Sequence, residues 1–247
     1  MPKLFDMNLR LLRRERAARR GLELFLFERA FEDCLDRLAL MNRRFERALL
    51  MGWADAGWGE RLRSVAAIVD QQDLRLVEDA WEPQAQSYDL VVSVGTLDTV
   101  NDLPLALQLI RYAMAPDALF IGALSGGETL PQLRAAMLAA DAVSGVAAPR
   151  VHPRIEPSAL SPLLADAGFV RPVVDVDRVE VSYPSLQRLV ADLRAMGATN
   201  ILRDRGPSLG RAARDAAARI FAAAGNGCRT VETFELLHFA AWTPARG

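Results

Sequence analysis

Short apolar segments alternate with helical segments through the middle of this chain, and this alternation constrains its fold more than any other feature. A helical segment at residues 103–114, closed by a turn at residues 115–118, separates the last two strand-like segments. Strands that alternate with helices are typical of βαβ units and of a mostly parallel sheet. The pattern therefore predicts an α/β, Rossmann-like fold with helices on both faces. The strand-like segments are residues 48–51, 65–69, 74–77, 90–94 and 119–123.

Helical patterns also flank this region. Residues 8–46 contain strong helix formers and no proline, which predicts two amphipathic helices that cap the sheet at its N-terminal side. Residues 230–241 alternate like an antiparallel C-terminal strand. We expect one domain over residues 1–247, made of N-terminal helices (1–46), a cofactor-binding half (47–124) and an embellished C-terminal half (125–247). In that last part we predict strands at residues 170–174 and 179–181 and helices at residues 130–141, 158–167, 185–196 and 211–223.

Charge and composition exclude several classes of protein. Lys and Arg number 30 against 31 Asp and Glu, a balance that does not support a nucleic-acid-binding surface. No run of 18 uncharged apolar residues exists, so no membrane span is expected. Cys34 and Cys228 lie far apart, which favours reduced thiols in a cytoplasmic protein.

Three features at consecutive strand ends suggest a site for an adenosyl cofactor. Such cofactors bind outside the carboxyl ends of the strands in open α/β sheets. The first feature is the turn after residues 48–51, where Gly52 is present but Ala54 and Ala56 stand where further glycines are expected. Gly57 and Gly59 could serve a shifted turn, and a plain strand-to-helix turn explains the segment equally well.

The second and third features are acids. Asp70 follows residues 65–69 and could accept the ribose hydroxyls; it could equally be a helix N-cap or a loop acid. Asp79 and Ala80 follow residues 74–77, where a side chain would meet the adenine. With the neighbouring residues, the predicted cofactor site comprises Gly52, Trp53, Ala54, Asp70, Asp79, Ala80 and Ser93.

Other reactive residues form no familiar catalytic set. The two histidines have no nearby serine nucleophile motif or metal-ligand cluster, so no metal is predicted. We interpret His152 as an exposed loop residue, with substrate binding as the alternative, and His238 as structural. Trp53 or Trp81 could stack on adenine or pack at the rim of the core. The basic run from Arg10 to Arg20 is interpreted as a solvated helix face, or as the source of an arginine that closes over the cofactor carboxylate.

Several segments resemble one known family. It is the methyltransferase-fold family that includes a mitochondrial assembly factor of respiratory complex I and, more distantly, the biotin-pathway malonyl-carrier-protein methyltransferase. The resemblance covers nearly the whole chain. It rests on residues 88–93, 100–104, 115–120 and 126–130, and further on residues 5–6, 14–18, 149–151, 167–169, 174–175, 183–185, 192–197 and 200.

The resemblance implies a class I methyltransferase fold and S-adenosylmethionine as cofactor. It further implies transfer of a methyl group to a protein or small-molecule acceptor, with Tyr183, Arg194 and Asn200 as acceptor-side candidates. Hydroxylation of an arginine on a respiratory-complex subunit is the related activity that the assembly factor suggests.

The chain also departs from the family pattern. Leu50 replaces the family's acid before the first glycine, Ala54 and Ala56 replace glycines, and Asp98-Thr99 replaces a His-Trp pair. These changes favour a second hypothesis, in which a catalytically degenerate fold acts as an assembly or interaction factor. A nucleotide-binding or NAD-binding enzyme on a similar sheet is disfavoured, because no G-x-G-x-x-G follows the first strand.

Overall fold

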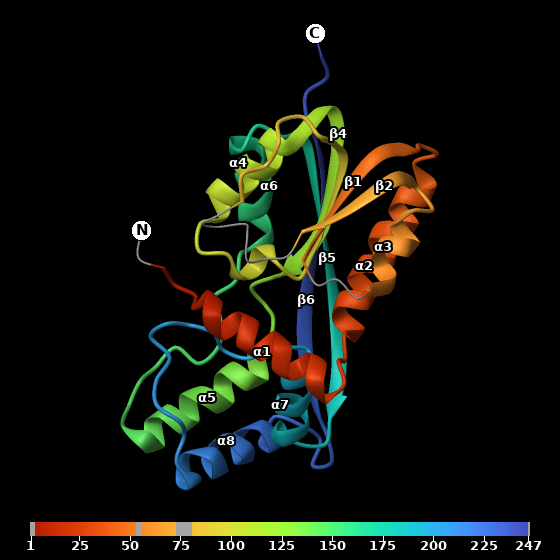
Figure 1. The fold of residues 1–247 in the computed structure, drawn as a ribbon. Helices are drawn as coiled ribbons and strands as arrows, with labels where there is room; N and C mark the ends of the chain where they lie inside the picture. Colours follow the sequence, from red (N-terminus) through yellow and green to blue (C-terminus); the bar gives the residue numbers. More distant parts are fainter. Residues whose placement is uncertain (1–2, 53–55, 73–80, 247) are drawn as a thin grey trace. The chain divides into compact units, whose positions relative to one another are not determined.

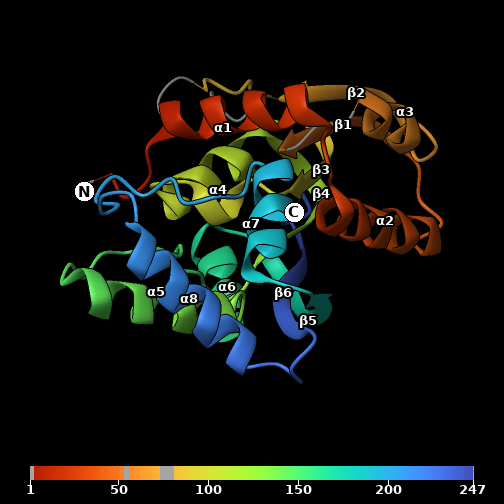
Figure 2. The same ribbon diagram turned by 90° about the horizontal axis from the view of Figure 1, so that it is seen from below.

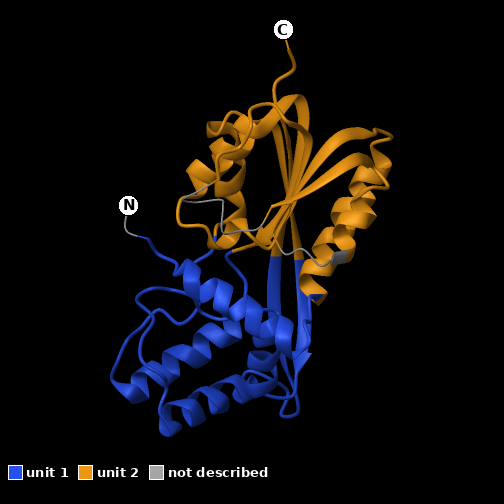
Figure 3. Ribbon diagram, viewed as in Figure 1, with its two compact units in different colours: residues 1–24, 127–154, 178–235 blue, residues 25–126, 155–177, 236–247 orange. Residues whose placement is uncertain are grey.

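The computed structural model describes residues 3–52, 56–72 and 81–246. Its chain divides into two compact units, neither of which is a continuous segment (Figure 3). Unit 1 comprises residues 1–24, 127–154 and 178–235, and unit 2 comprises residues 25–126, 155–177 and 236–247. Whether the units fold as one domain over residues 1–247 stays a prediction.

A six-stranded sheet gives unit 2 its framework, in the order β2-β1-β3-β4-β6-β5 (Figure 1). The pairs β1–β2, β1–β3 and β3–β4 are parallel, and β6 runs antiparallel to β4. The predicted α/β, mostly parallel sheet with an antiparallel C-terminal strand is confirmed. The strands are β1 (Phe45–Gly52), β2 (Ala66–Gln72), β3 (Tyr88–Val94), β4 (Met114–Ser125), β5 (Val170–Tyr183) and β6 (Thr230–Trp242).

Helices cover both faces of the unit 2 sheet, as Figures 1 and 2 show. One face carries α2 (Phe25–Leu40) and α3 (Ala56–Leu62), and the other carries α4 (Leu103–Ala113) and α6 (Pro157–Asp166). This arrangement explains why β3 and β4 read as continuous apolar runs, because both faces of these strands are buried.

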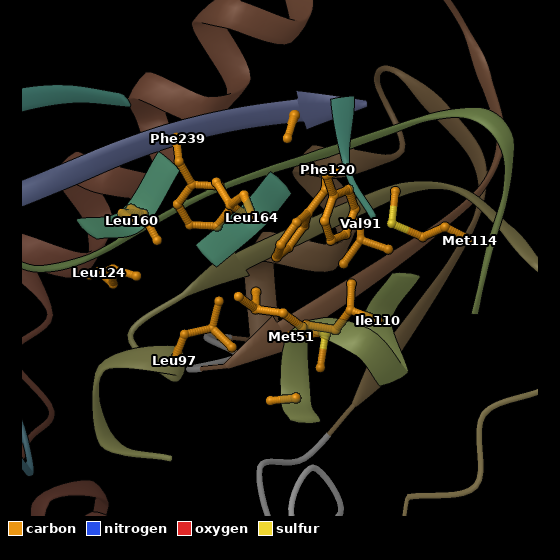
Figure 4. Close-up of a cluster of buried hydrophobic side chains, with 14 of the residues drawn as sticks. Met51, Val91, Leu97, Ile110, Met114, Phe120, Leu124, Leu160, Leu164 and Phe239 are labelled. Carbon is orange, nitrogen blue, oxygen red and sulfur yellow. The ribbon is translucent and has the colours of Figure 1, made fainter. Parts of the chain in front are cut away.

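The core of unit 2 lies between the sheet and the pair α4 and α6 (Figure 4). Phe120 of β4 lies at its centre, with ring centroids 5.2 Å from Phe169 and 4.8 Å from Phe239. Each fully buried side chain of this size contributes about 1.5–3 kcal/mol to folding. The strand directions in this unit are therefore held by a continuous apolar layer.

Unit 1 is mainly helical. Its helices α5 and α8 lie side by side (Figures 1 and 2). Their buried faces are rich in alanine, including Ala136 and Ala140 of α5 and Ala213 and Ala217 of α8, so the two backbones approach closely. The helices of this unit are α1 (Met7–Arg20), α5 (Pro131–Ser144), α7 (Leu186–Ala195) and α8 (Arg211–Ala223).

Three expected boundaries were wrong. Residues 115–118 do not form a turn but belong to β4, and residues 170–174 and 179–181 are parts of the single strand β5. Residues 45–46, expected in a helix, begin β1. The strand expected at residues 74–77 lies outside the described residues. Within the described part of the chain, no helix is long and apolar enough to cross a membrane.

Candidate functional site

The carboxyl end of β1 is shaped around Gly52. Its φ angle is +119°, and a Cβ built at this position would lie 2.0 Å from the carbonyl oxygen of Val94. Gly52 and Val94 are register partners, so the end of β1 lies directly beside the end of β3 in the sheet. Only glycine fits this position without moving the backbone. The predicted glycine thus lies where β1 leaves the sheet toward α3.

Ser93 lies one residue before the end of β3, between Met51 of β1 and Gly122 of β4. The side chain is fully buried, and its Oγ has no hydrogen-bond partner in the described part of the chain. A buried hydroxyl left unpaired costs about 1–3 kcal/mol. A polar atom of a bound ligand would offset that cost, so Ser93 and Gly52 together form a candidate cradle at the carboxyl edge.

Asp70 lies inside β2, two residues before its end, and pairs in register with Leu49. Its Oδ2 accepts a hydrogen bond from Arg47 Nε at 2.7 Å. The pKa of Tyr88 is raised first by burial and then by the charge and hydrogen bond of Asp70. The carboxylate therefore has two protein partners in this structure, and it is neither an N-cap nor a loop acid.

The residues that follow β3 show the structural role of the segment Asn101–Pro104. A 3₁₀ turn covers residues 97–99 and includes Asp98 and the buried Thr99. Asp102 then caps α4, because its Oδ1 accepts from the backbone N–H of Leu105 at 3.0 Å. Pro104 occupies the first turn, where the missing N–H is tolerated. This motif therefore begins a helix.

Four residues of the predicted cofactor site have no described position. Trp53, Ala54, Asp79 and Ala80 lie outside the described residues. Gly57 and Gly59 belong to α3 and not to a shifted turn.

The acceptor-side candidates lie in unit 1. Tyr183 ends β5 and is 2% exposed; burial first, and then Asp192, raises the pKa of its phenol. Arg194 is exposed near the end of α7. Neither side chain lines the cavity that Asn200 lines.

Asn200 links two loops. Its Nδ2 donates to the carbonyl of Pro149 at 2.9 Å, and its Oδ1 accepts from the backbone N–H of Leu202 at 2.8 Å. Both polar ends of the amide are therefore used within the chain. Asn200 therefore forms part of the wall of the cavity.

His152 corrects the expectation of an exposed loop residue. Its side chain is 5% exposed, and the Phe5 ring contacts it edge-on at 5.4 Å between centroids. The Arg10–Arg20 run is likewise not a uniformly solvated face, because Arg10 is 3% exposed. The sequence carried a weak signal for this, since Arg10 and Ala17 are seven residues apart on one helix face.

His238 is structural, as expected. It lies in β6 with 3% exposure, and its Nδ1 is 2.8 Å from Asp33 Oδ2 of α2. Arg37 binds the same Asp33 and also Asp175 of β5, each at 2.6 Å. The contacts of Asp33 with His238 and of Arg37 with Asp175 fasten α2 to the strands of unit 2.

Two tryptophans of the described residues, Trp58 and Trp81, pack against other side chains of the protein. Trp58 is buried in α3, stacked on Phe31 with 4.4 Å between ring centroids, and its Nε1 donates to Glu28. Trp81 packs against the core of unit 2.

Comparison with known proteins adds independent information. Arginine-hydroxylase NDUFAF5 of Mus musculus is 37% identical over 171 residues, which cover 68% of this chain and 50% of that protein. Malonyl-[acyl-carrier protein] O-methyltransferase of Halorhodospira halophila (strain DSM 244 / SL1) is 32% identical over 238 residues, 93% of this chain and 72% of that protein. The chain spans about half the length of the NDUFAF5 relatives. No family model matches the chain.

Among solved structures, a putative methyltransferase (BH2331) from Bacillus halodurans C-125 aligns with a TM-score of 0.53 at 10% sequence identity. The alignment covers 85% of this chain and 99% of that chain. At this identity the likeness supports the fold alone.

Proposed function

The chain belongs to the methyltransferase-fold family that includes malonyl-[acyl-carrier protein] O-methyltransferase and arginine-hydroxylase NDUFAF5, and we propose that it is an S-adenosylmethionine-dependent methyltransferase. The observation that carries this proposal is the cradle at the carboxyl edge of unit 2. There Gly52 leaves no room for a side chain, and Ser93 keeps a buried hydroxyl without a partner among the described residues. This is the place where the fold class binds adenosyl cofactors.

The described residues fit such a cofactor. Gly52 would let the cofactor approach the backbone, and the Ser93 hydroxyl would bind one of its polar atoms. S-adenosylmethionine supplies an activated methyl group, so the protein needs no metal or nucleophile of its own. Its task is to hold the acceptor in line with the methyl group and to exclude water, which alone supplies much of a rate enhancement.

The role that we propose for Asp70 is less direct than the roles of Gly52 and Ser93. To bind ribose hydroxyls it would have to exchange Arg47 and Tyr88 for the ligand. We therefore propose Gly52 and Ser93 as the primary contacts and Asp70 as a partner that reorganises on binding. Trp53, Ala54, Asp79 and Ala80 complete the proposed site by sequence.

The test is isothermal titration of the full chain with S-adenosylmethionine and S-adenosylhomocysteine. Ser93→Ala should weaken binding by about tenfold or more, which corresponds to ~1.4 kcal/mol. The same variant should not lose stability, because it removes a hydroxyl that has no partner in the part of the chain that the structure describes. The matched control is Ser87→Ala, just before the opposite end of the same strand, which should bind as the wild type does.

A companion pair tests the acid. Asp70→Asn should weaken cofactor binding if the carboxylate reorganises, whereas Asp117→Asn, which breaks a comparable ion pair with Arg43, should not. Failure of the wild type to bind either ligand would overturn the proposal.

That failure would favour the second candidate, a non-catalytic assembly or interaction factor. The observation in its favour is that Asp70 already has two protein partners. Its support from the sequence is Leu50, Ala54, Ala56 and the pair Asp98-Thr99, which depart from the family pattern.

The acceptor is proposed as a protein or a small molecule. The NDUFAF5 relative makes arginine hydroxylation on a respiratory-complex subunit a related proposal. Mass spectrometry of a modified acceptor separates the two activities, since one adds a methyl group and the other an oxygen atom. We further propose a cytoplasmic location, supported by two cysteines that form no disulfide.

A further inference from the structure

A cavity of about 140 Å³ lies within unit 1. Its wall is formed by α5, by α7 and by the loop residues 150–154 and 198–200, all of which belong to this unit. Most of the wall is apolar. The apolar residues that line it are Leu130, Leu133, Met137, Val151, Val190, Leu193 and Ala198.

Two helices supply much of this apolar wall. Leu133 and Met137 are four residues apart on α5, and Val190 and Leu193 are three residues apart on α7. Residues at these spacings lie on the same face of a helix. Each helix therefore presents one apolar strip to the cavity.

The polar side chains at the edge of the cavity are bound within the chain. Arg150 Nε donates to Asp141 Oδ1 at 2.9 Å, and its Nη1 donates to the carbonyl of Pro207 at 2.9 Å. The amide of Asn200 has both of its polar ends bound, as described above. These two side chains therefore shape the cavity without offering their bound atoms to a ligand.

His152 and Thr199 are engaged in the same way. The backbone N–H of Ile201 donates to His152 Nε2 at 2.9 Å, and His152 Nδ1 lies 3.4 Å from Nη2 of Arg154. The Thr199 hydroxyl accepts from Nη1 of Arg13.

These contacts decide how water behaves in the cavity. A water molecule inside a protein is held by roughly two to four hydrogen bonds to polar groups. The polar groups of this wall are used elsewhere, so water is held weakly there. An apolar group that displaces weakly held water gains free energy.

Leu130 gives a second, independent sign of a binding site. Its backbone is in the left-handed region, with φ +62° and ψ +46°, which a leucine rarely adopts. Its N–H donates to the carbonyl of Thr233 at 2.8 Å, and its own carbonyl accepts from the N–H of Arg134 at 3.0 Å. Strained residues that their surroundings hold in place cluster at binding sites, and Leu130 lines this cavity.

We infer that this cavity is a binding site for a compact apolar group of a small-molecule ligand, of the size of one six-membered ring. An apolar cavity of about 150 Å³ stays dry and binds benzene. The volume is below the roughly 300–1,000 Å³ of sites for whole drug-sized ligands, so the cavity takes one group of the ligand. The inference does not rest on methyl transfer.

The test is an NMR titration of the full chain with 13C-labelled methionine methyl groups, with benzene as the probe. The variants Met137→Leu and Met114→Leu assign one signal in the cavity wall and one in the core of unit 2. A bound aromatic ring shifts the signals of nearby methyl groups. We expect a saturable shift of the Met137 signal and none of the Met114 signal. Sodium acetate, a small polar molecule, is the second arm and should give no saturable shift.

A matched pair of substitutions completes the test. Val190→Phe fills the cavity from α7 and should weaken benzene binding by at least about tenfold. Val143→Phe, at a position on α5 that is 52% exposed and outside the cavity wall, should leave it unchanged.

Three results would overturn the inference. They are a Met137 signal that benzene shifts no more than the Met114 signal, acetate binding as tight as benzene binding, and a folded Val190→Phe variant that binds benzene as tightly as the wild type. The wild-type titration decides the matter even if Val190→Phe does not fold.

Discussion

Gly52 shows how one residue can be required by backbone geometry alone. Its positive φ angle and the nearby carbonyl of Val94 both exclude a side chain. The sequence located this glycine because it follows a strand-like run. The turn beyond it, at residues 53–55, lies outside the described residues.

Replacing Gly52 with alanine should therefore destabilise the protein by more than about 2 kcal/mol, since both strain and a clash are introduced. Urea unfolding measures the change. The control is Gly210→Ala, where φ is −66° and no atom of the described residues lies within 4 Å of the new Cβ. Equal stability of the two variants would contradict the described geometry of β1 and β3.

The burial of His152 makes stability depend on pH. In the unfolded chain this histidine binds a proton below its ordinary pKa of 6.5, whereas in the folded protein its pKa is about 2. Its contribution is therefore fully present above pH 6.5 and is lost as the pH falls, by about 1.4 kcal/mol per pH unit.

The measurement is the free energy of unfolding at pH 7 and pH 5. The wild type should lose about 2 kcal/mol more over this interval than His152→Gln. His238 is present in both proteins, so its own titration cancels in the difference. Parallel pH profiles would show that His152 is protonated in the folded state or exposed to water.

Residue types alone did not predict this environment. His152 was expected to be exposed because its loop is rich in proline. Its burial depends on Phe5 and Arg10, more than 140 residues away in sequence, and no local pattern reports such a contact.

At the scale of elements, local signals predicted most boundaries. Helix α8 covers the predicted residues, and Ser185 caps α7 through the N–H of Arg188. The errors have a common cause. Pro116 and Asp117 are turn formers, yet strand pairing and the Thr243 hydroxyl, which bonds Ala115 and Ala118, hold them in β4.

The polar middle of β5 was mistaken for a break between strands. Asp175 and Asp177 interrupt the apolar pattern there, but each is bound by an arginine of α2. Cross-element ion pairs therefore replace the apolar contacts that sequence patterns detect.

Helix α5 begins in an unusual way. Leu130 precedes it with a φ of +62° and makes no side-chain capping bond. The cap comes from β6, where the buried Glu232 accepts from the N–H groups of Gln132 at 3.2 Å and Leu133 at 2.9 Å. A negative charge at a helix N-terminus is favourable.

Glu232→Gln should destabilise the protein by about 1–3 kcal/mol, because the amide keeps only one accepting oxygen and loses the charge. Glu180→Gln, at an exposed position on β5, is the control and should change stability by less than about 0.5 kcal/mol. Thermal unfolding of the three proteins measures the effect. Equal losses in both variants would mean that the cap carries no energy.

At the scale of the molecule, β5 and β6 each contribute residues to both units. In unit 1, Glu232 of β6 accepts from the N-terminus of α5. In unit 2, the later residues of β6 pair with β4.

A chain that ends at residue 229 should therefore fold in neither unit, whereas a chain that ends at residue 244 should fold. Heteronuclear NMR and circular dichroism compare the two. A dispersed spectrum from the shorter chain would show that one unit is stable without β6.

The position of β6 near the end of the chain has a consequence for synthesis. On the ribosome, β1 to β4 emerge before β6. Until β6 pairs with it, β4 has an open edge along its apolar residues 118–124, which are buried in the folded protein. An open apolar edge invites pairing with other nascent chains. The newly made protein is therefore most vulnerable to aggregation in the interval before β6 leaves the exit tunnel, and chaperone capture in that interval would protect it.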